Sequence, residues 1–179
     1  DEVVASPGAF VHSGDADAAV DALLDAVTVT PDSLVIANVA GAGFAAAIAA
    51  GAMARWKLQP QFASTQGVAG HLRNAYADPG RLGVDRWLAM LAAAARSREA
   101  VCIVDAGTAI TIDVVAADGE HEGGYILPGL DLMRRALTGD TGDLARFTTG
   151  EAADAGAAPA PGRTTATAIA HGAVAAACA

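Results

Sequence analysis

Helical and extended patterns follow one another along the 179-residue chain. Apolar residues at helical spacing predict helices, and short β-branched runs bounded by Gly, Pro or Asn predict strands. Helices are predicted at 17–26, 44–56, 87–96 and 130–137, with a last one starting at Thr165. Strands are predicted at 33–38, 61–63, 101–104, 110–115 and 125–127. Residues 67–73 are predicted as a short helix or loop, and 152–161 as a mobile loop. The pattern indicates an α/β or α+β protein.

One strand–turn–strand segment combines the groups that a phosphate site requires. Val101–Val104 and Ile110–Val115 are both predicted to be buried strands. Between them, Asp105-Ala-Gly-Thr108 supplies a carboxylate, a permissive glycine and a hydroxyl, together with backbone N–H groups. A phosphate needs donors and its counter-cation needs a carboxylate, so this turn has groups for both. A simple β-hairpin with Gly at its tip is the alternative, and it is favoured when this motif is taken alone.

Two further segments carry candidate chemistry. In Asn74–Trp87, a Pro-Gly turn precedes Gly-Val-Asp-Arg at the head of an apolar helix. Asp85 is therefore expected near a helix N-terminus, where the dipole favours a carboxylate that acts as a cap or a base. A local salt bridge between Asp85 and Arg86 is the alternative. In Gly123–Gly129, flanking glycines leave the backbone open to a flat ligand, although such a segment by itself is more often a turn.

Composition and charge narrow the classes of function. The chain is 53% hydrophobic, and much of that fraction is alanine. A net charge of −9 and a pI near 4.6 argue against nucleic acid as a partner, since affinity for it depends on clustered Lys and Arg. The balance fits an acidic enzyme of cytosolic small molecules. The sequence contains no Gly-x-x-x-x-Gly-Lys-Ser/Thr motif, which excludes the common nucleotide-binding P-loop within it.

The cysteines, the histidines and the hydropathy of the chain argue against a disulfide framework, a zinc site and a membrane span. Cys102 and Cys178 cannot form a disulfide framework, and Cys102 is predicted to be buried and inert. The longest weakly polar run, 35–54, is interrupted by Asn38 and glycines, so no membrane span is expected. The histidines lack metal-ligand spacing and are predicted to be surface or capping residues instead of zinc ligands. They are His12, His71, His121 and His171.

Five motifs, in this order, resemble those of the type III pantothenate kinases. They are Val-Ile-Ala-Asn-Val-Ala-Gly at 35–41, Asn-Ala-Tyr with Gly-Val-Asp-Arg at 74–86, Asp-Ala-Gly-Thr-Ala at 105–109, Gly-Gly-Tyr-Ile-Leu-Pro-Gly at 123–129 and Gly-Arg-Thr-Thr at 162–165. The resemblance extends roughly from Val35 to Gly172. It implies an α/β fold of the actin, sugar-kinase and heat-shock ATPase superfold, with two ribonuclease-H-like lobes around a central cleft. The lobes are expected at 1–98 and 99–179.

The resemblance also implies a reaction, the ATP-dependent phosphorylation of pantothenate that opens coenzyme A synthesis. Asp85 is similar to the family's general base, which accepts the proton of the pantothenate hydroxyl. Thr165 is similar to a pantothenate contact that comes from the partner subunit of a homodimer. The other positions similar to pantothenate-binding residues are Tyr76, Gly83, Val84 and Arg86.

The nucleotide side follows from the same resemblance. Asp105 is similar to the ligand of a monovalent cation, K⁺ or NH₄⁺, and Thr108 with Gly107 to the ATP contacts. The adenosine-side positions are Gly123, Gly124, Pro128 and Gly129. Pantothenate, ATP and Mg²⁺ are the expected ligands, in a cytoplasmic enzyme.

The printed chain departs from the family pattern at its start. The family begins with a strand and a loop of the form Asp-x-Gly-Asn-Thr/Ser around the ATP phosphates, and this chain opens at Asp1-Glu-Val-Val without it. We therefore expect parts to be missing at both ends, and little kinase activity from a molecule that lacked this loop. Two alternatives stay open: a catalytically inactive relative that acts as a ligand-binding or regulatory accessory protein, and another phosphoryl-transfer or phosphatase member of the superfold.

Overall fold

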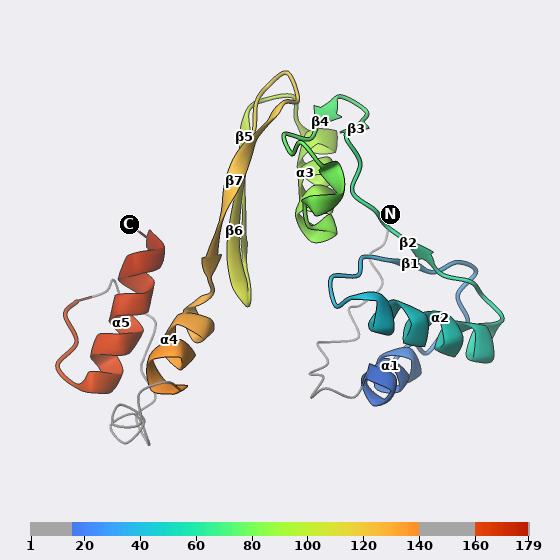
Figure 1. Cartoon of the computed structure of the whole chain (residues 1–179), viewed down its shortest axis with the longest axis horizontal. Coiled ribbons are helices and arrows are strands. Elements are labelled where there is room, and N and C mark those ends of the chain that lie inside the picture. The colour runs from blue at the N-terminus through green and yellow to red at the C-terminus, as the bar shows by residue number, and fades with distance from the viewer. Residues whose placement is uncertain (1–15, 140–159, 179) are drawn as a thin grey trace. The chain divides into compact units, whose positions relative to one another are not determined.

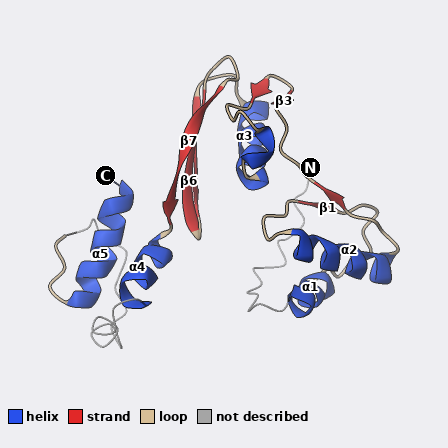
Figure 2. Ribbon diagram, viewed as in Figure 1, coloured by secondary structure: helices blue, strands red, loops and turns tan. Residues whose placement is uncertain are grey.

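A computed structural model describes residues 16–139 and 160–178 of the chain (Figure 1). Helices and strands both contribute, so the prediction of a mixed α/β protein is confirmed (Figure 2). The chain forms two compact units. The first comprises residues 1–69 and 76–91, and the second comprises residues 70–75 and 92–179. The predicted lobe boundary at 98/99 stays a prediction.

The first unit is organised around two helices. Helix α1 (Ala16–Asp25) is followed by strand β1 (Val35–Ile36), helix α2 (Ala42–Trp56) and strand β2 (Gln61–Phe62). β1 and β2 pair in parallel, so α2 is the crossover of a β–α–β unit. The apolar faces of the helices meet in one cluster because their large side chains recur at helical spacing. Its buried members are Val20, Leu24 and Ile48, with Ile36, Phe44, Ala47 and Trp56 packed against them.

An ion-pair network joins the polar sides of α1 and α2. The Arg55 guanidinium donates to Asp25 at 2.7 Å and to Asp21 at 3.1 Å. The hydrogen bond to Asp25, followed in size by the one to Asp21, raises the pKa of the Arg55 guanidinium. The carboxylates are largely exposed, so the network contributes little to stability.

The segment from 67 to 96 contains more structure than the sequence predicts. In place of a helix or loop, residues 67–73 contain strands β3 (Val68–Ala69) and β4 (Leu72–Arg73) on either side of Gly70, whose φ is +60°. A 3₁₀ helix follows at Pro79–Arg81, capped by the Asp78 side chain. Helix α3 (Val84–Arg96) begins three residues before the predicted start at Trp87. It begins there because the Gly83 carbonyl already accepts the Trp87 N–H at 3.0 Å.

The second unit contains an antiparallel sheet in the order β5–β6–β7. Its strands are β5 (Val101–Ala106), β6 (Ala109–Val115) and β7 (His121–Pro128). β6 is central and pairs with a neighbour on each side. β7 begins four residues before the predicted Tyr125, since its first half carries His and Gly in place of β-branched residues.

The prediction that β5 is buried, and Cys102 with it, is wrong. Cys102 is exposed and Val104 is 60% exposed. An unbroken apolar run is typical of a strand covered on both faces, but β5 lies at the edge of an antiparallel sheet. Within β5, only Val101 and Ile103, on the alternate face, are half-buried.

Two helices complete the second unit. Helices α4 (Leu130–Gly139) and α5 (Thr165–Cys178) pack against each other (Figure 1). The buried face of α5 consists of Ala166, Ala170 and Ala173, whose small side chains allow close packing. The predicted loop at 152–161 lies almost entirely outside the described residues. No helix in the described part of the chain is long and apolar enough to cross a membrane.

Replacing Gly119 with alanine is expected to destabilise the second unit. Gly119 has φ +87°, and a Cβ there would collide with the His71 carbonyl oxygen. We expect a loss of about 2 kcal/mol in the free energy of unfolding, measured by urea denaturation. Gly43→Ala is the matched control, because its Cβ would meet nothing within 4 Å and it lies in α2. Equal urea midpoints for the two variants would contradict the proposed clash.

Candidate functional site

Tyr76 and Arg86, ten residues apart in sequence, lie in contact in the first unit. The Arg86 guanidinium donates to the Tyr76 hydroxyl at 3.1 Å, and its central carbon is 5.9 Å from the centroid of the ring. Arg86 is only 6% exposed, so its charge is held in a nearly dry position. The hydrogen bond to the Tyr76 hydroxyl holds the guanidinium in one orientation. A guanidinium held in this way is preorganised to bind an anionic group beside the ring.

Asp85 lies in the first turn of α3, as expected from the sequence. Its Oδ1 accepts the backbone N–H of Arg86 at 2.8 Å, and the residue is exposed. The preceding Gly83 leaves room for this carboxylate, since a Cβ on Gly83 would lie 2.5 Å from Asp85 Oδ1. A carboxylate exposed at a helix start, with one oxygen oriented by a backbone donor, has the geometry of a base available to a ligand.

The loop before α3 forms one wall of a pocket in the first unit. Its volume is about 450 Å³. The opposite wall comes from the segments that follow β1 and β2, and Thr65 ties the walls together by donating from Oγ1 to the Leu82 carbonyl at 2.8 Å. The lining includes Gly83 and Val84, both predicted to bind substrate, and also Asn38, which the sequence did not assign to a site.

In the second unit, the β5–β6 turn packs backbone against backbone with the start of α4. The Gly129 N–H donates to the Thr108 carbonyl at 2.8 Å, and the Gly107 N–H donates to the Ala109 carbonyl at 2.9 Å. A Cβ on Gly129 would collide with the Gly107 carbonyl oxygen, so glycine is required at this approach. Asp105 is exposed at the end of β5, and Thr108 is exposed in the turn. The structure thus places four predicted nucleotide-side positions, Asp105, Gly107, Thr108 and Gly129, around one turn.

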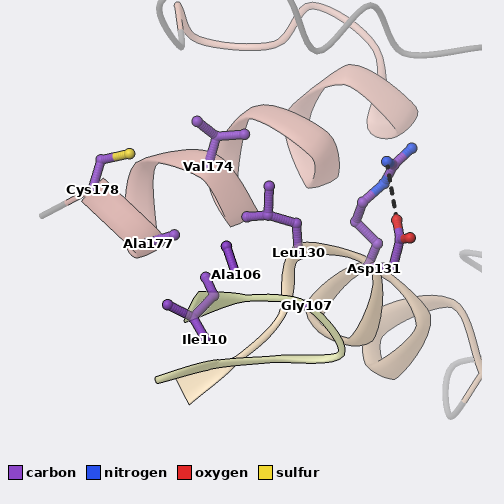
Figure 3. Close-up of a pocket in the computed structure, with 9 residues that line it drawn as sticks. Ala106, Gly107, Ile110, Leu130, Asp131, Val174, Ala177 and Cys178 are labelled. Atoms are coloured by element: carbon purple, nitrogen blue, oxygen red, sulfur yellow. Dashed lines mark ion pairs between the residues drawn. The ribbon is translucent and has the colours of Figure 1, made fainter. Parts of the chain in front are cut away.

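A pocket of about 360 Å³ opens beside this turn (Figure 3). Gly107 and Ile110 line it from the hairpin, Leu130 from α4, and Val174 and Cys178 from α5. On its α4 side, Arg134 and Asp131 form an ion pair at 3.7 Å, the dashed line in Figure 3. A mainly apolar cavity with a few charged groups at one side suits a flat, partly polar ligand.

The remaining predicted nucleotide-side residues lie along β7. Gly123 and Gly124 pair with Val114 and Asp113, and Pro128 pairs with Ala109 at the end that leads to the turn. Gly123 has φ +110°, and a Cβ there would meet nothing within 4 Å. The backbone is therefore open at Gly123, as the sequence pattern suggests.

Thr165 is the first residue of α5 and is half-buried. The helix is capped by its neighbour, because Thr164 Oγ1 accepts the Thr167 N–H at 3.2 Å and Thr167 Oγ1 accepts the Thr164 N–H at 3.0 Å. Thr165 is thus not needed as the cap.

One prominent polar pair was missed by the sequence analysis. His121 is 1% exposed and Asp113 is 2% exposed, and they hydrogen-bond at 3.0 Å. The prediction of a surface or capping role is therefore wrong for His121, while His71 and His171 are partly exposed and His12 is not among the described residues. The signal was an aspartate in the apolar run 110–115. Within residues 16–139 and 160–178, no group of three or more His, Cys, Asp or Glu side chains could hold a metal ion.

Comparisons with known proteins agree on one family. A family profile described as "Type III pantothenate kinase" matches residues 6–179. A type III pantothenate kinase of Aromatoleum aromaticum is 48% identical over 139 residues, which cover 76% of this chain and 55% of the relative. One from Nitrosococcus oceani is 43% identical over 113 residues, covering 60% of this chain and 42% of the relative. One from Marinobacter nauticus is 37% identical over 141 residues, covering 79% and 56%.

The chain spans about half the length of the curated relatives that it matches. The family profile, by contrast, extends over nearly all of the chain and over both units described above. The chain therefore belongs to the type III pantothenate kinase family.

Proposed function

We propose that the protein carrying this chain transfers the γ-phosphoryl group of ATP to the primary hydroxyl of pantothenate, giving 4′-phosphopantothenate for coenzyme A synthesis. The observation that carries the proposal is the arrangement at the start of α3. There, an exposed carboxylate at Asp85 directly precedes a buried guanidinium that contacts Tyr76. Family membership supplies the reaction, and this arrangement supplies groups for its acceptor side.

Asp85 acts as the general base in this proposal. The pantothenate hydroxyl attacks the γ-phosphorus as its proton passes to an Asp85 oxygen, and the bond from phosphorus to the β,γ-bridging oxygen breaks, releasing ADP. Phosphoryl transfer needs little covalent help, so positioning and charge neutralisation carry most of the catalysis. A base within hydrogen-bond reach of the hydroxyl contributes the proton-transfer part.

Tyr76 and Arg86 hold the acceptor. Pantothenate carries one carboxylate, and a guanidinium such as that of Arg86 binds a carboxylate as a charge-assisted pair. Gly83 and Val84 form the adjoining pocket wall, where the absence of a side chain at Gly83 lets the ligand approach the backbone. In this proposal the hydroxyl end of the substrate lies toward Asp85.

The nucleotide side is assigned to the second unit. Gly107 and Thr108 face the phosphates, and the Gly123, Gly124, Pro128 and Gly129 backbone faces the adenosine. Asp105 provides an exposed carboxylate oxygen of the kind that hard cations prefer, and it would hold the monovalent cation, K⁺ or NH₄⁺. The cations, Mg²⁺ included, would neutralise charge that develops on the phosphates.

The remaining assignments concern the assembly. Thr165 belongs to the pantothenate site of the partner subunit in a homodimer. Its side chain is not needed to cap α5, because Thr164 already caps the helix. Residues 1–98 and 99–179 form the two ribonuclease-H-like lobes of an actin-type fold, and the enzyme works in the cytoplasm.

Asp85→Asn tests the proposed base. The variant keeps the size of the side chain and its backbone hydrogen bond but cannot accept a proton, so kcat should fall by about 10² or more with a small change in the KM for pantothenate. The measurement is ADP formation by the full-length protein with pantothenate, Mg²⁺ and K⁺.

Asp32→Asn is the matched control, since Asp32 is an exposed aspartate of the same unit outside the site and should leave kcat unchanged. Full activity of Asp85→Asn would reassign the base. A folded wild-type protein without pantothenate-dependent turnover would reject the kinase proposal and favour a non-catalytic accessory role.

Asp105→Asn tests the cation site. Removing the carboxylate charge should raise the K⁺ concentration needed for half-maximal rate by about tenfold, since a ligand anion is lost. Initial rates are compared over a KCl series with ionic strength held constant. An unchanged K⁺ dependence in this variant would show that Asp105 is not a ligand.

A further inference from the structure

The peptide that directly precedes α3 is held by a side chain from a distant part of the chain. Thr65 lies beyond β2 and is half-buried, and its Oγ1 donates to the Leu82 carbonyl at 2.8 Å. Both residues belong to the first unit, 17 positions apart in sequence. A carbonyl that is taken out of water needs a donor, so this hydroxyl fixes the direction in which the Leu82 carbonyl faces.

The turn that contains Leu82 is fixed by other contacts as well. Leu82 is only 2% exposed, and its N–H donates to the Pro79 carbonyl at 3.2 Å. A Cβ on Gly67 would lie 3.5 Å from Pro79 Cγ, so the segment that follows Thr65 packs against this turn. Thr65 and Leu82 therefore belong to two segments that lie against each other, and their hydrogen bond is part of that packing.

The Leu82 carbonyl is the group that would accept the first hydrogen bond of a longer helix. In an α-helix each N–H donates to the carbonyl four residues back, so the helical partner of the Arg86 N–H would be Leu82. Here the Leu82 carbonyl accepts from Thr65, and the Arg86 N–H donates to Asp85 Oδ1 at 2.8 Å. The helix accordingly begins at Val84, and Leu82 is extended, with φ −74° and ψ 129°.

Two side chains thus take the places of one helical hydrogen bond. Local side-chain bonds of Thr and Asp compete with the helical ladder for backbone groups. Because the Thr65 hydroxyl engages the Leu82 carbonyl, the Arg86 N–H is left for the Asp85 carboxylate. Asp85 is exposed, and an exposed side chain samples several rotamers unless a directional bond restricts it. The orientation of the proposed base therefore depends on a hydroxyl 20 positions earlier in the sequence.

We propose that Thr65 is a positioning residue for the phosphoryl transfer. By engaging the Leu82 carbonyl, its hydroxyl keeps the Arg86 N–H bonded to Asp85. The carboxylate is thereby held in the orientation that accepts the proton of the pantothenate hydroxyl. This inference rests on the proposed function. Thr65 acts through the backbone at the start of α3, so it changes how often the base is correctly placed and not how tightly the substrates bind.

Thr65→Val tests the proposal in the full-length protein. Valine keeps the shape of threonine but removes the hydroxyl, so the Leu82 carbonyl becomes a competing acceptor for the Arg86 N–H. Loss of one such bond should lower kcat roughly three- to tenfold, while the KM values for pantothenate and ATP change by less than about twofold. Thr65→Ser, which keeps the hydroxyl, should retain the wild-type kcat. Thr65→Cys, whose thiol is a weaker donor, should give an intermediate kcat and serves if the valine variant does not fold.

A double-mutant cycle with Asp85→Asn separates positioning from a general effect on the fold. The amide cannot accept a proton, so its orientation no longer governs the rate, and Thr65→Val should cost no further activity in that background. Thr30→Val is the matched control, because Thr30 is an exposed threonine of the same unit and its replacement should leave kcat unchanged. An equal loss from Thr65→Val with and without the Asp85 carboxylate would overturn the proposal.

The crystal structure of the Thr65→Val protein provides a readout that does not require activity. The Arg86 N–H should turn to the Leu82 carbonyl, which extends α3 by one residue at its start, and the Asp85 carboxylate should lose its backbone donor. An Arg86 N–H still bonded to Asp85, or a variant that loses stability yet keeps its kcat, would overturn the positioning role and leave the kinase proposal intact. A folded wild-type protein without pantothenate-dependent turnover would overturn both.

Discussion

The geometry of the second unit depends on the central position of β6, whose backbone is paired along both edges. Antiparallel pairing on both sides places the turn to β5 at one end of the strand and the turn to β7 at the other. The first end carries the predicted nucleotide-side residues Asp105 and Thr108. The second end carries Gly119, whose carbonyl accepts the Arg73 N–H, and His121, whose side chain accepts the Ala75 N–H. A shift of β6 would therefore displace both groups together.

Glycine makes the close approaches at each end possible. At one end, Gly129 lies against the carbonyl groups of Gly107 and Thr108, and at the other, Gly119 lies against the His71 carbonyl. At Gly129 the approach lets its N–H donate to the Thr108 carbonyl, while at Gly119 the carbonyl accepts the Arg73 N–H. Glycine thus serves two purposes. At Gly123 it leaves the backbone open to a ligand, and at Gly119 and Gly129 it lets two backbone segments pack directly against each other.

The sequence predicted most helices and strands because their apolar periodicity and boundary residues are local signals. It also located Asp85 at a helix start, because Pro79-Gly80 marks the turn before it, and Asp105 at a strand end, because Gly107 marks the turn after it. It could not predict the contact between Arg86 and Tyr76, which depends on the three-dimensional path of the chain between these two residues. The failure at Cys102 has a physical cause, since an apolar run does not reveal that its strand lies at a sheet edge.

The case of His121 shows why the sequence alone could not find the buried pair. Its partner is eight residues away, and the two meet only because one extra residue in β7 reverses the face on which the imidazole lies. Bulges leave almost no trace in composition, so face assignments beyond them are inverted. The bulge also explains the aspartate within the apolar run of β6. Asp113 faces the core because the His121 imidazole lies there and hydrogen-bonds to it. The second ring nitrogen of His121 accepts the Ala75 N–H.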